Sequence, residues 1–161
     1  MLKNYKIEIK WGLIFALMTL VWVALEKLGG FHDVRIEQHA IVTNLISIPA
    51  IAIYVFALLD KKRNFFNGKM TYLQGFVSGL IITLVVTILS PVTQSIVSYV
   101  ITPDFFDSFI QFTVESGKKT LEEAQAYFNN RNYVIQGLIG APVMGIMTSA
   151  IVAIFTKSRT K

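Results

Sequence analysis

Residues 75–101 read GFVSGLIITLVVTILSPVTQSIVSYVI, a run without a single charged side chain. A helix that crosses the hydrocarbon core of a bilayer needs about 20 mostly apolar residues. The run is longer than that, so it predicts a transmembrane helix that tilts, bends at Pro91 or projects beyond the membrane. Because proline has no N–H to donate, Pro91 also leaves the Thr87 carbonyl in need of another partner.

Three more apolar stretches of this kind lie at about residues 11–28, 40–59 and 133–155. Hydrophobic residues make up 53% of the 161-residue chain and charged residues 16%, whereas a soluble domain carries roughly 25% charged residues. The sequence therefore predicts an all-α polytopic membrane protein, a single domain over residues 1–161 built as a bundle of four transmembrane helices. No A-x-A-like cleavage site follows residues 11–28, so we expect this stretch to be a span and not a cleaved signal peptide.

Basic residues gather in three segments that four spans would place on one side of the membrane. They are Lys3, Lys6 and Lys10; Lys61, Lys62, Arg63 and Lys69; and Lys157, Arg159 and Lys161. Because Lys and Arg are enriched in cytoplasmic segments, this pattern predicts that both termini are cytoplasmic. It also accounts for the net charge of +5, so we expect the lipid bilayer, and not nucleic acid, as the partner of the basic face.

The loop at residues 102–132, on the opposite side, has a helical pattern of its own. Thr102-Pro103-Asp104 is typical of a helix start, with Pro103 at the first helical position. Thr120 and Glu123 fit a capping box for a second short helix. The apolar face of the first helix would carry Phe105, Phe109 and Phe112, with Phe106 and Ile110 beside them. We predict an outer amphipathic helical hairpin, either lying on the membrane surface or packed on the ends of the bundle.

Small residues recur at every fourth position of the third and fourth spans. They are Gly75, Gly79, Thr83 and Thr87 in the third, and Gly137, Ala141, Gly145 and Ser149 in the fourth. Such stripes let helix backbones approach closely inside a membrane. They predict helix packing, either between these two spans or against another protein or a second copy of the chain.

Four polar residues fall within or at the end of the apolar spans: Glu26, Asn44, Gln94 and Gln136. In the predicted topology all four lie in the outer half of the membrane. Polar side chains inside spans usually face the interior of the bundle. These four therefore form either hydrogen bonds between helices or a small polar pocket that opens to the outer side.

Residues that could carry chemistry are few. His32, Asp33, Glu37 and His39 share the first outer loop, but their spacing matches no compact metal motif, so we expect no metal and no cofactor. The absence of cysteine excludes disulfides and thiolate chemistry. The sequence has no G-x-S-x-G, P-loop or H-E-x-x-H motif, so we expect the protein not to be an enzyme.

Several short stretches carry a resemblance to a known family. They are residues 68–76 (GKMTYLQGF), 89–91 (LSP), 101–104 (ITPD) and 122–124 (EEA). With its length and four spans, the chain resembles the domain of unknown function 4199 family of small bacterial membrane proteins. The resemblance implies four helices in a Gram-negative inner membrane, and it brings no substrate, cofactor or catalytic residue.

Two functions are compatible with these features. The first is an accessory or scaffolding subunit of the inner (plasma) membrane that acts through helix packing and its outer loop, with another membrane protein or itself as partner. The alternative is a small transporter or channel subunit that works as a homo-oligomer. A water-filled cavity converging on the four polar residues would favour the alternative.

Overall fold

The computed structural model describes residues 5–158 of the chain. Within that range it contains helices and no strand, and four segments are long and apolar enough to cross a membrane. The predicted all-α fold is therefore confirmed. The elements are α1 (Lys6–Leu28), η2 (Ile36–Gln38), α2 (His39–Asn44), α3 (Ser47–Asn64), α4 (Tyr72–Ile96), η3 (Val97–Ile101), α5 (Phe105–Glu115), α6 (Leu121–Tyr127) and α7 (Asn130–Thr156).

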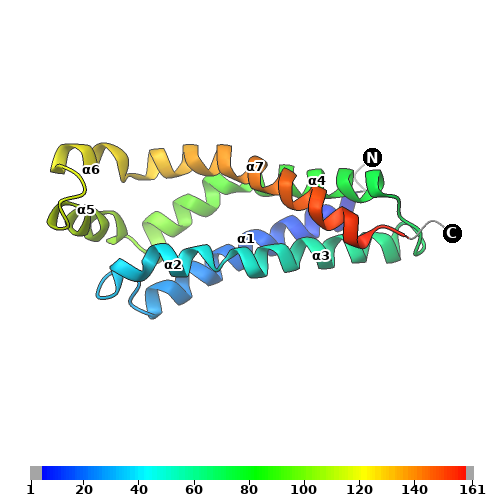
Figure 1. The fold of residues 1–161 in the computed structure, drawn as a ribbon, viewed down its shortest axis with the longest axis horizontal. Helices are drawn as coiled ribbons and strands as arrows, with labels where there is room; N and C mark the ends of the chain where they lie inside the picture. Colours follow the sequence, from blue (N-terminus) through cyan, green and yellow to red (C-terminus); the bar gives the residue numbers. More distant parts are fainter. Residues whose placement is uncertain (1–4, 159–161) are drawn as a thin grey trace.

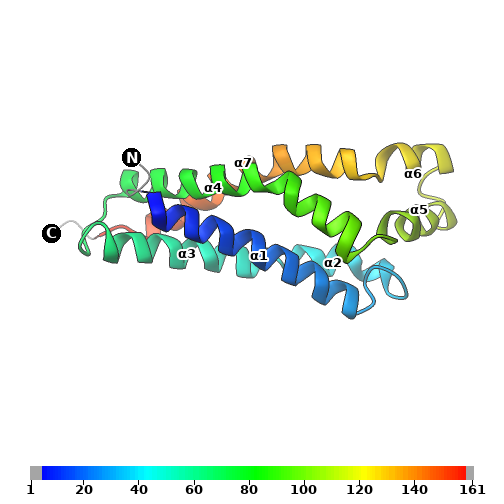
Figure 2. The same ribbon diagram turned by 180° about the vertical axis from the view of Figure 1, so that it is seen from behind.

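The helices form an elongated bundle with two distinct ends (Figure 1). The start of α1, the α3–α4 turn and the end of α7 meet at one end, which we call the proximal end (Figures 1 and 2). The α1–α2 turn and the α5–α6 hairpin lie at the other, the distal end. The start of α1 and the end of α7 thus share an end, as four spans require. Of the basic residues that predict the orientation, Lys3, Arg159 and Lys161 lie outside the described residues.

The small-residue stripes of α4 and α7 face each other. A Cβ atom added at Gly79 would lie 2.6 Å from the Cβ of Ser149, and one added at Gly145 would lie 2.9 Å from the Cβ of Thr83. At Gly75 the added atom would lie 3.4 Å from the Cβ of Ala153. The distances at Gly79 and Gly145 are shorter than two real Cβ atoms can reach. Only glycine at these two positions therefore lets the helices come together.

Proline shapes the second, third and fourth spans. The second span is not one continuous helix: α2 ends at Asn44 and α3 begins at Ser47, with Leu45 and Ile46 in a turn. Pro49 explains the break, because its ring clashes with the carbonyl four residues back, that of Leu45. In α4, Ser90 donates its hydroxyl proton to the Thr87 carbonyl at 2.9 Å, which satisfies the acceptor that Pro91 leaves free.

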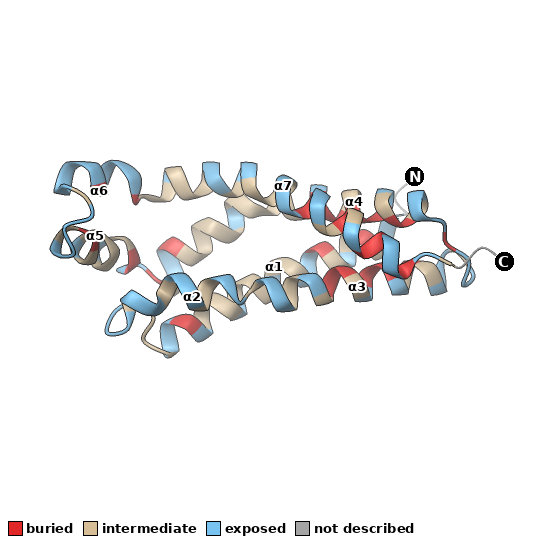
Figure 3. Ribbon diagram, in the orientation of Figure 1, coloured by how far each residue is buried: buried red, intermediate tan, exposed pale blue. Residues whose placement is uncertain are grey.

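The two helices that contain a proline beyond their first turn, α4 and α7, both bend. α4 turns away from α7 in its distal part (Figure 2), and α7, which contains Pro142, changes direction along its length (Figure 1). Buried residues consequently gather in the proximal half of the bundle, and the distal half is mostly of intermediate or full exposure (Figure 3). The proximal core is formed by Tyr54, Ala57, Leu58, Met70, Ile82, Val152 and Ala153.

The loop between the third and fourth spans is a helical hairpin, as predicted. The Thr120–Glu123 capping box is present: the Glu123 N–H donates to the Thr120 hydroxyl at 3.2 Å, and the Thr120 N–H donates to the Glu123 carboxylate at 2.9 Å. The first helix, α5, begins at Phe105 and not at Pro103. Its Phe105 and Phe109 rings pack against His39 at centroid distances of 5.1 and 5.6 Å. The hairpin therefore packs on the distal end of the bundle.

Candidate functional site

A cavity of about 220 Å³ opens at the distal end, between the α1–α2 turn, the last turns of α4 and the hairpin. Its walls combine apolar side chains with an unusual concentration of polar ones for a helical membrane bundle. The lining residues are Val23, Glu26, His32, His39, Thr43, Gln94, Val97, Ser98, Thr102, Phe105 and Tyr133.

Glu26 lies in the wall of this cavity and is only 3% exposed. It is two residues from the end of α1, and the Trp22 indole N–H, one helical turn earlier, donates to its Oε1 atom at 2.7 Å. The other oxygen, Oε2, lies 3.2 Å from Nε2 of His32. Among residues 5–158, Glu26 forms an ion pair with no lysine or arginine.

A tight turn brings the two histidines back onto Glu26. Gly30 has a φ of +77°, a left-handed conformation that glycine adopts without steric cost. The Phe31 N–H bonds to the Glu26 carbonyl at 3.0 Å, so the chain reverses at once after α1. His32 then lies 6% exposed beside Glu26, and the His39 ring, at the start of α2, lies 5.1 Å from the His32 ring.

The structure brings together two of the four residues of the predicted polar pocket. Glu26 and Gln94 line the distal cavity, where the Gln94 amide donates to Ser98 at 2.9 Å. Asn44 lies outside it and donates to the carbonyl of Ala40 at 2.6 Å. Gln136 is exposed on α7. Asn44 instead lines a separate, mainly apolar cavity together with residues of α3 and α7, and Gln136 lies on α7, from which the distal part of α4 turns away (Figure 2).

In the sequence, His32 and His39 share the first outer loop with Asp33 and Glu37. The structure separates the two histidines from the two acids. The histidines turn inward onto Glu26, whereas Asp33 and Glu37 are exposed. One ligand-type atom each from Glu26, His32 and His39 lies within 4.8 Å of the other two. The spacing of these residues along the chain does not predict the cluster, because the cluster forms only through the reversal of the chain at Gly30.

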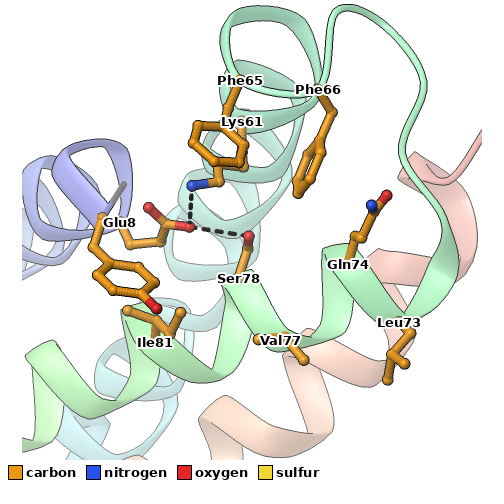
Figure 4. A pocket seen from close by; sticks show the side chains of 10 residues that line it. Glu8, Lys61, Phe65, Phe66, Leu73, Gln74, Val77, Ser78 and Ile81 are labelled. Carbon is orange, nitrogen blue, oxygen red and sulfur yellow. Dashed lines mark hydrogen bonds and ion pairs between the residues drawn. The ribbon is translucent and has the colours of Figure 1, made fainter. Parts of the chain in front are cut away.

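A second buried cluster, at the proximal end, escaped the sequence analysis. Lys61 is one of the basic residues that predict the orientation, and Glu8 lies among the first lysines of the chain, yet their side chains are 3% and 1% exposed. The Lys61 ammonium lies 2.8 Å from Oε1 of Glu8, and the Ser78 hydroxyl donates to the same oxygen at 3.0 Å (Figure 4). The ring of Phe65 lies 3.7 Å from the ammonium.

This cluster ties three helices together, since Glu8 is on α1, Lys61 on α3 and Ser78 on α4. Close by, Asp60 accepts hydrogen bonds from Lys10 and from the Trp11 indole, the latter at 2.7 Å. The sequence held one signal of this arrangement. Glu8 is the one acid among the lysines that precede the first apolar span, at a position where it can pair with a basic residue of another segment.

The fold and its two buried clusters define an all-helical bundle of the kind found in multi-pass membrane proteins. The family model described as "Protein of unknown function (DUF4199)" matches residues 10–158. The chain belongs to this family, as the resemblance implied. No curated protein and no solved structure matches the chain.

Proposed function

We propose that the chain is a non-catalytic accessory subunit of a larger assembly in the inner (plasma) membrane, with both termini in the cytoplasm, and that it docks through the distal half of α7. The small-residue stripes do not support docking, because Gly79 and Gly145 are already covered by Ser149 and Thr83 within the chain. The observation that carries the proposal is the position of Gln136.

Gln136 is exposed on the surface of an apolar helix, and its side-chain amide makes no hydrogen bond among residues 5–158. At a rise of 1.5 Å per residue it lies about 10 Å from the midpoint of α7, whereas half of the hydrocarbon core is about 15 Å thick. An amide without a partner in lipid is costly. A polar side chain of a neighbouring protein at the same depth would satisfy it.

The surface around Gln136 suits close approach. Gly140 lies one turn further along α7, and a Cβ atom built there has no atom within 4 Å. Val143 follows on the same face and is 52% exposed. A partner helix could therefore approach the α7 backbone at Gly140 while it hydrogen-bonds to Gln136.

The test is gentle extraction of the tagged protein from native membranes, followed by the mass and composition of the complex. We expect a stoichiometric second membrane protein with the wild type, and its loss with Gln136→Leu and with Gly140→Leu. Leu84→Phe is the matched control, because Leu84 is 59% exposed on α4, away from the proposed surface. A wild-type monomer, or a complex that all variants keep, would contradict the proposal.

A homo-oligomeric transporter or channel subunit is the second candidate, and the distal cavity with Glu26 and Gln94 favours it. A second cavity of about 290 Å³ lies nearer the proximal end, with Asn44 and Tyr54 in its walls, and beyond it core residues such as Leu58 and Ile82 are 0% and 1% exposed. A solute path would therefore have to form between copies. The same extraction separates the two candidates, because a complex that contains only this chain supports the second.

A further inference from the structure

We propose that Glu26, His32 and His39 form a binding site for a divalent late transition metal, with Zn²⁺ as its representative. The site lies in the distal cavity and does not depend on the docking surface of α7. It differs from the expectation from sequence, which was that the first outer loop binds no metal.

The distances fit a zinc site. Zinc bonds of about 2.0–2.2 Å place tetrahedral ligands about 3.3–3.5 Å apart. Oε2 of Glu26 and Nε2 of His32 already lie 3.2 Å apart, and the three ligand atoms lie within 4.8 Å of one another. The third ligand must therefore approach by little more than about 1 Å. His39 is only half-buried, which leaves its ring room to turn.

An unsatisfied ring nitrogen of His39 gives independent support. The Nδ1 atom of His39 is buried and has no hydrogen-bond partner among the described residues. A buried polar atom without a partner is destabilising, and a bound ion is one of the ordinary explanations for such an atom. His32 would bind the ion through Nε2, the atom that faces Oε2 of Glu26.

The surroundings orient the carboxylate and enclose the two imidazoles. The Trp22 indole donates to Oε1 of Glu26 at 2.7 Å, which leaves Oε2 directed at the histidines. Such outer hydrogen bonds to a ligating carboxylate orient it toward the metal. Phe105 packs on both imidazoles, at centroid distances of 5.0 Å from His32 and 5.1 Å from His39. Its apolar ring limits access of water to the site.

The donor set selects the class of metal. Two imidazoles and a carboxylate suit Zn²⁺ and its neighbours, whereas Mg²⁺ and Ca²⁺ prefer sites made of oxygen atoms. A buried carboxylate without a lysine or arginine partner also favours a dication beside it. Three protein ligands leave a fourth position open toward the cavity, for water or a small ligand.

The composition of the chain limits the number of competing metal ligands in a binding experiment. It has two histidines and no cysteine, so a protein purified through a histidine-free tag offers no other imidazole or thiolate. We would measure Zn²⁺ binding by equilibrium dialysis with metal analysis, and follow the two imidazoles by ¹⁵N NMR during the titration. One equivalent of Zn²⁺ should bind, and one nitrogen of each imidazole should shift.

Variants identify the ligands. His39→Ala and Glu26→Gln should each weaken Zn²⁺ binding more than about 100-fold, beyond the effect of changing an outer-shell partner. Glu37→Gln, a change at an exposed acid of the same loop, should bind like the wild type. Binding that survives both ligand variants, or imidazole signals that stay unmoved by Zn²⁺, would overturn the proposal. The NMR result on the wild type decides the matter even if a variant fails to fold.

Discussion

The Lys61 ammonium lies 2.8 Å from the Glu8 carboxylate, and both side chains are almost completely shielded from solvent. The pair joins α1 to α3, and the Ser78 hydroxyl adds α4 through its hydrogen bond to Glu8. Removing one charge from such a pair leaves the other buried without compensation, which typically costs about 3–5 kcal/mol. The proximal cluster should therefore be a point of strong energetic coupling between three spans.

We expect Glu8→Ala to lower the thermal stability of the detergent-solubilised protein sharply, with Lys61→Met having a comparable effect. The double variant should be less damaging than the sum of the two, because it leaves no unpaired charge. Melting temperatures of the four proteins, followed by circular dichroism, give the coupling. Strictly additive losses would show that the pair does not act as a unit.

The contact between α4 and α7 gives a second prediction. Gly79→Leu and Gly145→Leu should each destabilise the fold by at least about 1–3 kcal/mol, because the added side chain meets Ser149 or Thr83. Gly140→Leu adds the same bulk where nothing lies within 4 Å of the Cβ position. It should leave the melting temperature of the isolated chain close to that of the wild type. Equal losses in all three variants would contradict the packing described here.

The sequence was sufficient for the architecture because span length and apolar character are constraints that each helix meets on its own. The capping box at Thr120 and Glu123 was likewise visible, since its two hydrogen bonds join residues three apart. The break at Leu45 and Ile46 was not foreseen. It follows from Pro49 through the carbonyl four residues back.

The candidate sites were harder to foresee for a different reason. The distal cluster depends on a reversal at Gly30 that places His32 on Glu26, and no metal motif has this spacing. The proximal cluster pairs Glu8 with Lys61 across 53 residues of sequence. Such contacts depend on the packing of whole helices, and neither the charge count nor the periodicity of a single helix contains them.

A substitution at Trp22 tests the metal site without changing any of the three proposed ligands. Trp22→Phe removes the indole N–H that holds Oε1 of Glu26, so we expect Zn²⁺ affinity to fall about 10–100-fold while the stoichiometry stays at one. Trp11→Phe is the matched control, because Trp11 donates to Asp60 at the proximal end. If both variants bind Zn²⁺ like the wild type, Trp22 does not position the carboxylate.

Acid should loosen α6. The pKa of the Glu123 carboxyl lies below its ordinary value of 4.5. The main cause is the hydrogen bond from the backbone N–H of Thr120, and a hydrogen bond with the Thr120 side chain adds to it. Because the pKa of Glu123 is lower in the folded state than in the unfolded state, its stabilisation of the fold is complete above the unfolded-state pKa. The stabilisation is lost as the pH falls through the folded-state pKa. Amide hydrogen exchange in α6 should therefore accelerate in acid, after correction for intrinsic rates.

Glu123→Gln provides the control for this effect, because glutamine also completes a capping box but does not titrate. Its α6 protection should vary less with pH than that of the wild type. Glu123→Ala should expose α6 to exchange at neutral pH as well. Identical pH profiles for wild type and Glu123→Gln would assign the acid effect to another group.

The absence of cysteine permits a direct test of orientation. Ser116→Cys places a thiol on the exposed distal hairpin, and Asn64→Cys places one on the exposed proximal end of α3. If basic segments stay in the cytoplasm, a membrane-impermeant maleimide should label Ser116→Cys in intact cells and Asn64→Cys only after lysis. The reverse pattern would invert the topology and put the Glu26–His32–His39 cluster on the cytoplasmic side. Since metal supply differs between the two sides of a membrane, this result also determines which pool of Zn²⁺ the site would meet.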